Sequence, residues 1–359
     1  MSSWAGAPLL ASPLIYVASA ATAEVSWAET IAVAHRSRRS LRHGAPQAQA
    51  SDSREPGVSA ERSVYMASPE LKALIEALRS QPTPENPTVE MLRQGLLGLT
   101  SQFPVPADVV CTPVEAGSVP AEWVSAPSAD AERVVLYLHG GGYYSGSIVT
   151  HRALAAGIAR AAGVRALALD YRLAPEHPFP AAIDDALAAY RWLLAQGTPA
   201  DRIAIVGDSA GGGLTLALLV ALRDAGLPRP VAAVVLSPWV DLEGTGESMS
   251  QRAALDPVVT KESMLWASAM YLNGADPRSP LAAPLYADLS GLPPIYIQVG
   301  TAEVLYDDAM RFAERARAAG VEITVDPWDE VFHVWHLAYT LPEAREAMDR
   351  IGDFLRKKL

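Results

Sequence analysis

Short apolar runs, separated by segments of helical periodicity, constrain the fold of this chain more than any other feature. The runs lie at Val134–Leu138, Arg165–Leu169, Ile203–Val206, Val231–Leu236 and Ile295–Val299. Runs that are apolar on both faces are typical of parallel strands buried between two layers of helices. The segments between them place apolar residues on one helical stripe, as Leu214, Leu218 and Leu222 do. This alternation predicts an α/β fold with a mostly parallel, doubly wound sheet.

The stretch before this pattern divides into two parts. Residues 1–65 are largely aperiodic and rich in Ala, Ser, Pro and charge, so we expect an extension that is disordered or outside the fold. Residues 8–20 resemble a short secretory apolar region, but no Lys or Arg precedes them and Pro13 interrupts them. We therefore expect a cytoplasmic protein. Residues 66–105 are expected to form two helices, one capped by Ser68 with Pro69 at its first position and one over Thr88–Leu99.

The connection before the last apolar run is unusually long. More than fifty residues separate Leu236 from Ile295, and they include a helical pattern over Thr260–Tyr271. In sheets of this kind ligands bind at the carboxyl edge, so we expect an insertion over that edge. The resulting division is 66–105 as cap helices, 106–236 as the first part of the core, 237–275 as the cap insertion and 276–359 as the second part of the core.

Charge and cysteine content exclude several kinds of partner. The net charge of −11 and pI near 5.1 argue against nucleic acid and against an anionic membrane surface. No apolar run reaches the roughly 18 to 20 residues of a membrane span. The single cysteine, Cys111, excludes an internal disulfide and a Cys-based zinc site.

A serine stands in a strand–turn–helix context at residues 207–211, GDSAG. In the G-x-S-x-G pattern the glycines permit a tight turn, and the serine hydroxyl projects above the sheet. The following helix points backbone N–H groups at the same place. A phosphate-binding loop is excluded because no Gly-Lys-Ser/Thr follows. The pattern predicts that Ser209 is a nucleophile.

A serine nucleophile needs a base and an acid. In the folds that carry this kind of serine turn, the acid and then the base follow the serine in the chain. Only His333 and His336 lie beyond the serine, both in FHVWH, and a zinc site is disfavoured there because no glutamate stands between them and no third ligand is near. The segment after the run at Ile295–Val299 offers three carboxylates, and Glu303 is nearest the strand end. Asp307 is the second choice for the acid. We expect Asp307 and Asp308 to be solvated residues in the first turn of a helix.

Together these segments resemble the hormone-sensitive-lipase-like branch of the α/β-hydrolases, which includes the bacterial family IV esterases. The segments that carry the resemblance are HGGG at 139–142, DYRLAPEHPFPAA at 170–182, GDSAGG at 207–212, SPLAAPLYADLSGLPPIYIQVG at 279–300 and HVWH at 333–336. It covers residue 66 to the C-terminus and places the chain in the GDSAG subgroup. It implies a helical cap over the core and selects His333 as the base.

The resemblance also assigns supporting roles. It implies an oxyanion hole from the N–H groups of Gly141, Gly142 and Ala210. His139, Gly140, Asp208 and Glu176 are implied to support this loop and the serine turn. The acid of the branch is most often the aspartate of a D-P-L tripeptide, whereas this chain has Glu303 followed by Val304 and Leu305, a departure that some members share. Tyr143, Tyr144 and Trp239 are candidates for the pocket wall, with packing preferred.

The predicted function is a serine carboxylic ester hydrolase for a small-molecule ester of short to medium acyl chain, without cofactor or metal. Two alternatives stay open at this point. One is an amidase, carbamate hydrolase or deacetylase with the same triad, and the other is a non-catalytic small-molecule receptor on this scaffold. The resemblance also makes a homodimer possible, because members of the branch often pair through an edge strand.

Overall fold

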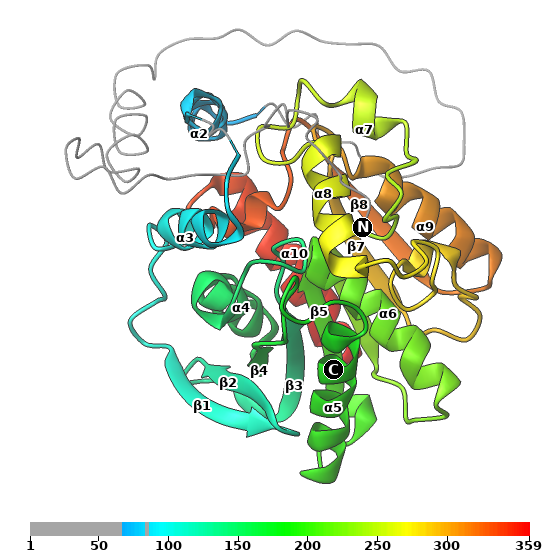
Figure 1. Ribbon diagram of the computed structural model, residues 1–359. Coiled ribbons are helices and arrows are strands. Elements are labelled where there is room, and N and C mark those ends of the chain that lie inside the picture. The colour runs from blue at the N-terminus through cyan, green and yellow to red at the C-terminus, as the bar shows by residue number, and fades with distance from the viewer. Residues whose placement is uncertain (1–66, 83–85) are drawn as a thin grey trace, which may run out of the picture.

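One eight-stranded sheet forms the centre of the protein (Figure 1). The computed structural model describes residues 67–82 and 86–359. The strands are β1 (Val110–Ala116), β2 (Val119–Ser125), β3 (Asp130–Leu138), β4 (Val164–Leu169), β5 (Ile203–Asp208), β6 (Ala232–Leu236), β7 (Ile295–Gly300) and β8 (Ile323–Trp328). Their order is β1-β2-β4-β3-β5-β6-β7-β8, antiparallel from β1 to β4 and parallel from β4 to β8. The predicted mostly parallel sheet is confirmed.

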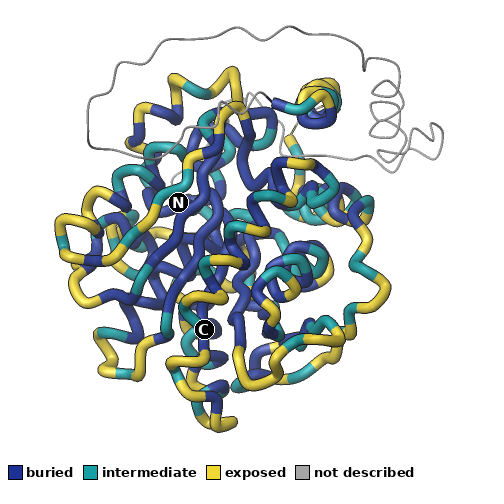
Figure 2. Tube along the Cα trace, turned by 180° about the vertical axis from the view of Figure 1, so that it is seen from behind, coloured by how far each residue is buried: buried dark blue, intermediate teal, exposed yellow. Residues whose placement is uncertain are grey.

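The central strands are buried on both faces, as their apolar composition requires. Every residue of β5, β6 and β7 is buried, and Figure 2 shows these buried strands running through the middle of the molecule. In the register Leu138 lies opposite Gly207, and Asp208 lies opposite Leu236. The carboxyl ends of β3, β5 and β6 therefore lie side by side, and the loops that follow them meet at one edge.

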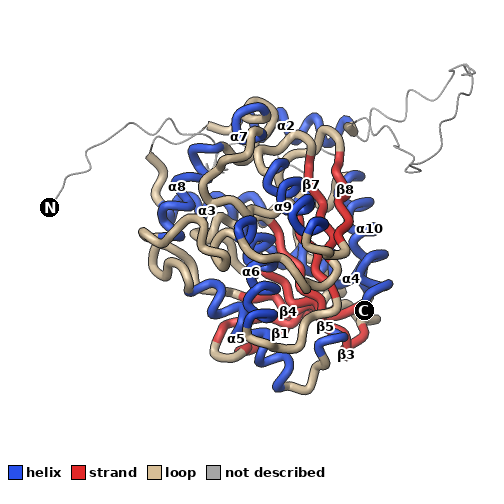
Figure 3. Tube along the Cα trace, turned by 90° about the vertical axis from the view of Figure 1, so that its right-hand side faces the viewer, coloured by secondary structure: helices blue, strands red, loops and turns tan. Residues whose placement is uncertain are grey.

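Helices cover both faces of the sheet, which is the doubly wound arrangement. The helices are α2 (Pro69–Ser80), α3 (Val89–Thr100), α4 (Ile148–Ala162), α5 (Ala181–Ala195), α6 (Ala210–Asp224), α7 (Ser248–Gln251), α8 (Lys261–Leu272), α9 (Tyr306–Ala318) and α10 (Pro342–Lys358). Buried residues of α4 and α10 pack on one face, and those of α5, α6 and α9 pack on the other. Figure 3 shows α4 and α10 on one side of β7 and β8, with α6 and α9 on the other.

Helix starts follow the capping chemistry of the sequence. The hydroxyl of Ser68 accepts from Leu71 N–H at the start of α2, and that of Thr88 accepts from Met91 N–H at the start of α3. Ser147 and Thr150 form a capping box at the start of α4, so that helix begins at Ile148.

The connection between β6 and β7 contains two helices, α7 and α8, which lie with α2 and α3 beyond the carboxyl ends of the strands (Figure 1). Helix α8 spans Lys261–Leu272 with Thr260 as its N-cap, in agreement with the pattern at 260–271. The extension at 1–65, with its apolar stretch at 8–20, lies outside the described residues. Within the described part of the chain, no helix is long and apolar enough to cross a membrane.

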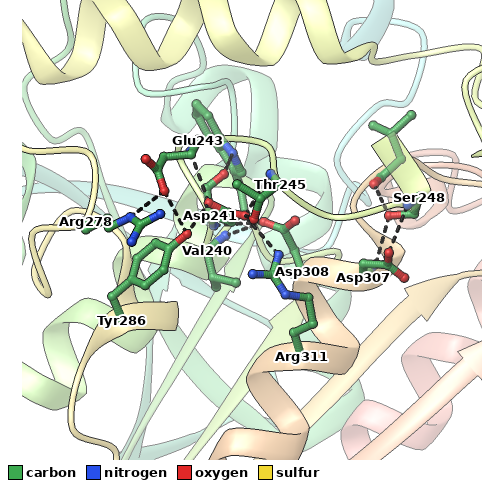
Figure 4. A network of polar contacts seen from close by, with 12 residues as sticks. Val240, Asp241, Glu243, Thr245, Ser248, Arg278, Tyr286, Asp307, Asp308 and Arg311 are labelled. Atoms are coloured by element: carbon green, nitrogen blue, oxygen red, sulfur yellow. Dashed lines mark hydrogen bonds and ion pairs between the residues drawn. The ribbon is translucent and has the colours of Figure 1, made fainter. Parts of the chain in front are cut away.

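A buried polar network ties the segment after β6 to α9 (Figure 4). The prediction that Asp308 is solvated was wrong, because its side chain is buried and accepts from the N–H groups of Val240 and Asp241. Burial raises the pKa of Asp308 to about 8. The neighbouring carboxylate of Asp241 pairs with Arg311 at 2.9 Å. The network therefore fixes the start of the insertion against the helix that follows Glu303.

Candidate active site

Ser209 stands in the turn between β5 and α6, in a backbone conformation that non-glycine residues rarely adopt. Its φ is 52° and its ψ is −119°, and its N–H donates to Leu236 O at 2.8 Å. The turn needs glycine beside the serine, since a Cβ at Gly211 would lie 2.0 Å from Leu138 O. The close approach of β3 to this turn therefore explains the glycine and leaves the serine projecting past the strand ends.

A continuous hydrogen-bonded relay joins the predicted nucleophile, base and acid. The Nε2 atom of His333 lies 2.8 Å from Ser209 Oγ, and its Nδ1 atom lies 2.8 Å from Glu303 Oε2. The other carboxylate oxygen of Glu303 accepts from Gly300 N–H at 2.8 Å. Glu303 follows β7 and His333 follows β8, so adjacent strands of the sheet deliver the two residues to one place. All three side chains are buried.

The environment of His333 favours its charged form. Burial alone would lower the pKa of His333, but the hydrogen bond and charge of Glu303, together with the charges of Asp256 and Asp208, outweigh it. The pKa of His333 therefore lies above the usual 6.5. In the neutral ring, the contact with Glu303 assigns the proton to Nδ1. Nε2 then faces the serine hydroxyl with a free lone pair and can accept its proton.

The HGGG loop lies beside Ser209 with its backbone sharply turned. Gly141 has a φ of 114° and Gly142 a φ of 62°, and a Cβ at Gly141 would lie 2.3 Å from Ser145 O. The N–H groups of Tyr144 and Ser145 both donate to Gly141 O and lock the turn. Gly141 and Gly142 line the same cavity as Ser209 and His333. Ala210 is the first residue of α6, so its N–H has no acceptor within the helix.

Asp208 holds the HGGG loop from the other side of the serine. Its buried carboxylate accepts from Gly140 N–H at 3.0 Å and from the hydroxyl of Tyr137, and it lies 3.4 Å from Nε2 of His151. Burial alone would raise the pKa of Asp208, but the attraction of His151 and these hydrogen bonds hold it below its usual value. Asp208 therefore contacts the HGGG loop directly, through Gly140, and its supporting role stays a prediction.

The other conspicuous histidines lie away from the relay. His139 stacks on Tyr171 with ring centroids 4.2 Å apart, and its Nδ1 lies 2.7 Å from Gly140 O. Nε2 of His336 lies 2.9 Å from the side-chain oxygen of Gln298. Burial lowers the pKa of His139 and of His336 to about 3, so both rings are neutral. Neither hydrogen-bonds to Ser209.

Glu176 reaches the HGGG loop only through a residue of α3. It forms a bidentate pair with Arg93, at 2.7 and 2.9 Å, and its own side chain is about half exposed. The remaining N–H groups of Arg93 donate to the carbonyls of Tyr144 and Ala174. Asp307, the second choice for the acid, points elsewhere and accepts from Ser248 N–H at 2.9 Å.

A cavity of about 90 Å³ opens above the relay. Its lining includes Ser209, His333 and the glycines of the HGGG loop. The rest of the wall is largely apolar, with side chains from α3 and α8, namely Leu92, Leu96, Leu99, Met264 and Ala267. Tyr144 also lines it. Tyr143 and Trp239 instead pack within the core, where Tyr143 stacks on Tyr271 at 3.7 Å. Packing, the preferred role for the three aromatic residues, therefore holds for two of them.

Three residues near the site were missed from the sequence: Arg93, His151 and Asp256. Arg93 contacts the HGGG loop, His151 faces Asp208 and lines the cavity, and Asp256 contacts the turn that carries Glu303. None belongs to a motif, and each is brought to the site only by the packing of a helix or loop. In the described ranges, no group of three or more His, Cys, Asp or Glu side chains is arranged to hold a metal ion.

Comparison with known proteins places this geometry in a family. Residues 135–337 match the family model described as alpha/beta hydrolase fold. The chain belongs to the α/β-hydrolase family. An acetyl-hydrolase of Streptomyces hygroscopicus is 46% identical over 301 residues, which are 81% of this chain and 97% of that protein. An esterase of Acinetobacter venetianus is 34% identical over 290 residues, 79% of this chain and 94% of that protein.

Solved structures narrow the family further. An esterase from the bacterial hormone-sensitive lipase family is 50% identical, with a TM-score of 0.79 over 82% of this chain and 99% of that one. EstE5, solved after soaking with p-nitrophenyl butyrate, is 46% identical, with a TM-score of 0.79 over 81% of this chain and 99% of that one. This α/β-hydrolase is a carboxylesterase of the hormone-sensitive-lipase family, as its motifs predicted. Its place in the GDSAG subgroup stays a prediction.

Proposed function

We propose that this carboxylesterase cleaves esters of short to medium acyl chains through a covalent acyl-enzyme on Ser209, with His333 as the base and Glu303 as the acid. The observation that carries the proposal is the buried relay, in which His333 lies 2.8 Å from both Ser209 Oγ and Glu303 Oε2. A serine hydroxyl becomes a strong nucleophile only when a base takes its proton, and the base works only when a third group fixes its tautomer.

The reaction has two halves with the same proton carrier. Ser209 Oγ attacks the carbonyl carbon while His333 Nε2 takes the serine proton. The tetrahedral intermediate collapses when His333 returns that proton to the leaving alkoxide oxygen, which breaks the ester C–O bond and releases the alcohol. Water then attacks the acyl-enzyme, again losing a proton to His333, and the second collapse frees the carboxylic acid and restores Ser209.

The oxyanion is proposed to be held by the N–H groups of Gly141, Gly142 and Ala210. Two observations support this assignment: Gly141 and Gly142 face the cavity that contains Ser209, and Ala210 N–H begins α6 without an intrahelical acceptor. Backbone donors fixed in advance stabilise the developing charge without reorganisation, and removal of one such donor typically costs about 10² to 10³ in kcat.

The size of the substrate follows from the cavity and its cover. We propose that 66–105 and 237–275 form a cap over a core made of 106–236 and 276–359, because α3 and α8 supply the apolar wall above Ser209. A small cavity of about 90 Å³ suits a short acyl chain better than a long one. The soak of EstE5 with a butyryl ester makes p-nitrophenyl butyrate a sensible first substrate.

An acetyl amide is the second candidate substrate. The relative from Streptomyces hygroscopicus is named an acetyl-hydrolase, and that name specifies the acyl group without the bond that is cleaved. Expulsion of an amine uses the same relay, with His333 protonating nitrogen in place of oxygen. A homodimer, the other partner predicted from the resemblance, stays a prediction.

A panel of p-nitrophenyl esters from acetyl to palmitoyl, with p-nitroacetanilide as the matched amide, tests the proposal. We expect kcat/KM to be highest for acetyl to hexanoyl esters, to fall steeply for longer chains, and to be lower for the anilide than for p-nitrophenyl acetate. The Ser209→Ala variant is expected to retain the fold and lose turnover of every substrate. Palmitoyl preference would contradict the proposed size, and faster anilide cleavage would favour the amide.

A further inference from the structure

A second carboxylate lies buried beside the relay. Asp256 stands in the insertion between α7 and α8, and the residue is 6% exposed. It belongs to no motif and has no part in the steps above. Burial of a carboxylate needs strong compensation, so its contacts indicate what it does.

The Asp256 carboxylate joins two parts of the site that are distant in sequence. Oδ2 accepts from Val304 N–H at 3.1 Å, directly after Glu303. Oδ1 accepts from the N–H groups of Val258 and Val259, at 2.9 and 3.2 Å. Both valines line the cavity above Ser209. One carboxylate therefore holds the turn that carries the acid and the wall that faces the substrate.

The charge of Asp256 also acts on the base. Burial raises the pKa of Asp256 to about 6, and the negative charge of Glu303 acts in the same direction. The attraction of His333 and the backbone hydrogen bonds act in the opposite direction and limit the rise. Within the described residues, the carboxylates whose charge raises the pKa of His333 are Glu303, Asp256 and Asp208, so all three favour the imidazolium. Asp256 makes no hydrogen bond with the ring, so it acts through space. Its negative charge is present above pH 6, where the reaction needs a proton-accepting His333.

We propose that Asp256 is a positioning residue of the esterase: it anchors the Glu303 turn to the cavity wall and supplies a second negative charge that stabilises the His333 imidazolium. The inference rests on the proposed function, because it assumes that His333 is the base. It differs from a purely structural role, since a neutral residue of the same shape would keep the fold and change the titration of His333.

The test compares pH profiles of kcat/KM for p-nitrophenyl butyrate between pH 5 and 9 in the wild-type protein and in Asp256→Asn. The acid limb of this profile reports the base of the free enzyme. We expect its midpoint to move down by about half a pH unit in Asp256→Asn, less than the one to three units of a directly contacting charge. At pH 8 we expect kcat to fall about tenfold, because the NH₂ group of the asparagine would face a buried backbone N–H that the Asp256 carboxylate accepts from in the wild-type protein.

Two matched variants separate charge from structure. Asp307→Asn removes a carboxylate that also anchors the insertion, through Ser248 N–H, but does not face His333; its midpoint is expected to equal that of the wild-type protein. Asp256→Glu keeps the charge but displaces the contact with Val304, so we expect a lowered kcat with a midpoint close to wild type. If Asp256→Asn does not fold, Asp256→Ser replaces it in the pH profile, because this variant also removes the negative charge and the same downward shift of the midpoint is expected.

A lowered kcat in Asp256→Asn with an unmoved midpoint would overturn the proposal, as would a downward shift of the same size in Asp256→Glu or Asp307→Asn. Failure of the underlying function has a different outcome. In that case Ser209→Ala keeps its turnover, or the wild-type profile shows no acid limb at all.

Discussion

Replacement of Glu303 by glutamine tests the relay at the position where the sequence departs from the aspartate usual in its family. The carboxylate serves two donors at once, Nδ1–H of His333 and Gly300 N–H, each at 2.8 Å. An amide has one acceptor oxygen and can serve only one of them. If the oxygen stays on Nδ1–H, the new NH₂ group faces Gly300 N–H in a buried site, at a cost of about 1 to 3 kcal/mol.

The alternative orientation disables the base. When the amide oxygen faces Gly300 N–H, the NH₂ group donates to Nδ1 of His333, so the ring proton moves to Nε2. Nε2 then donates to Ser209 and cannot accept its proton. The imidazolium of the transition state also loses its counter-charge. We expect kcat to fall by roughly 10³ to 10⁴, about 4 to 5.5 kcal/mol in the activation free energy.

Steady-state hydrolysis of p-nitrophenyl butyrate at pH 8 measures this loss. We expect KM to change little, because Glu303 contacts His333 and does not line the cavity. Thermal unfolding followed by circular dichroism checks that the variant is folded. Asp307→Asn is the matched control and should keep kcat within about twofold, since that carboxylate binds Ser248 N–H and does not contact His333. A loss below tenfold in Glu303→Gln, or an equal loss in Asp307→Asn, would refute the assignment of the acid.

Three further predictions follow from the same geometry. Because the pKa of His333 lies above 6.5 and only the neutral ring accepts a proton, kcat/KM should fall as the pH drops, with a midpoint above 6.5; a rate independent of pH from 5 to 9 would contradict this. The pKa of Asp308 rises from 3.8 to about 8 on folding, so the folded state is stabilised by the protonated carboxyl group. This contribution to the free energy of unfolding is fully present below pH 3.8 and is lost as the pH rises to 8. Urea unfolding should therefore show stability falling between pH 5 and 8, by up to about 1.4 kcal/mol per unit, and falling less in Asp308→Asn; parallel curves would argue against a protonated Asp308. Gly211→Ala should lower the free energy of unfolding by about 3 kcal/mol or prevent folding, as its Cβ would meet Leu138 O and His139 O at 2.0 and 2.4 Å, and a stability equal to wild type would disprove this clash.

The sheet was predictable from the sequence because parallel strands between two helix layers must be apolar on both faces. Every apolar run became a strand, from β3 to β7. The serine turn was predictable for a local reason, since strand, Gly207, Ser209, Gly211 and helix are contiguous. The order of acid and base along the chain then reduced the remaining choice to a few residues, and the structure brings Glu303 and His333 to Ser209.

What escaped prediction depends on packing between distant segments. Asp308 looked like a solvated residue of a helix start, but its partners are Val240 and Asp241, 68 and 67 residues earlier in the chain. Asp256 contacts Val304 across 48 residues, from a loop without a motif. Contacts of this length arise only when the insertion folds onto the sheet edge, so neither periodicity nor a local motif could reveal them.

The most direct test of the central claim is identification of the atom that carries the acyl group. The wild-type protein is mixed with p-nitrophenyl butyrate, quenched in acid within milliseconds, digested and mapped by mass spectrometry. The account predicts a butyryl group on the peptide that contains Ser209, and its absence in Ser209→Ala. A butyryl group on another residue, or rapid wild-type turnover that Ser209→Ala retains, would contradict it.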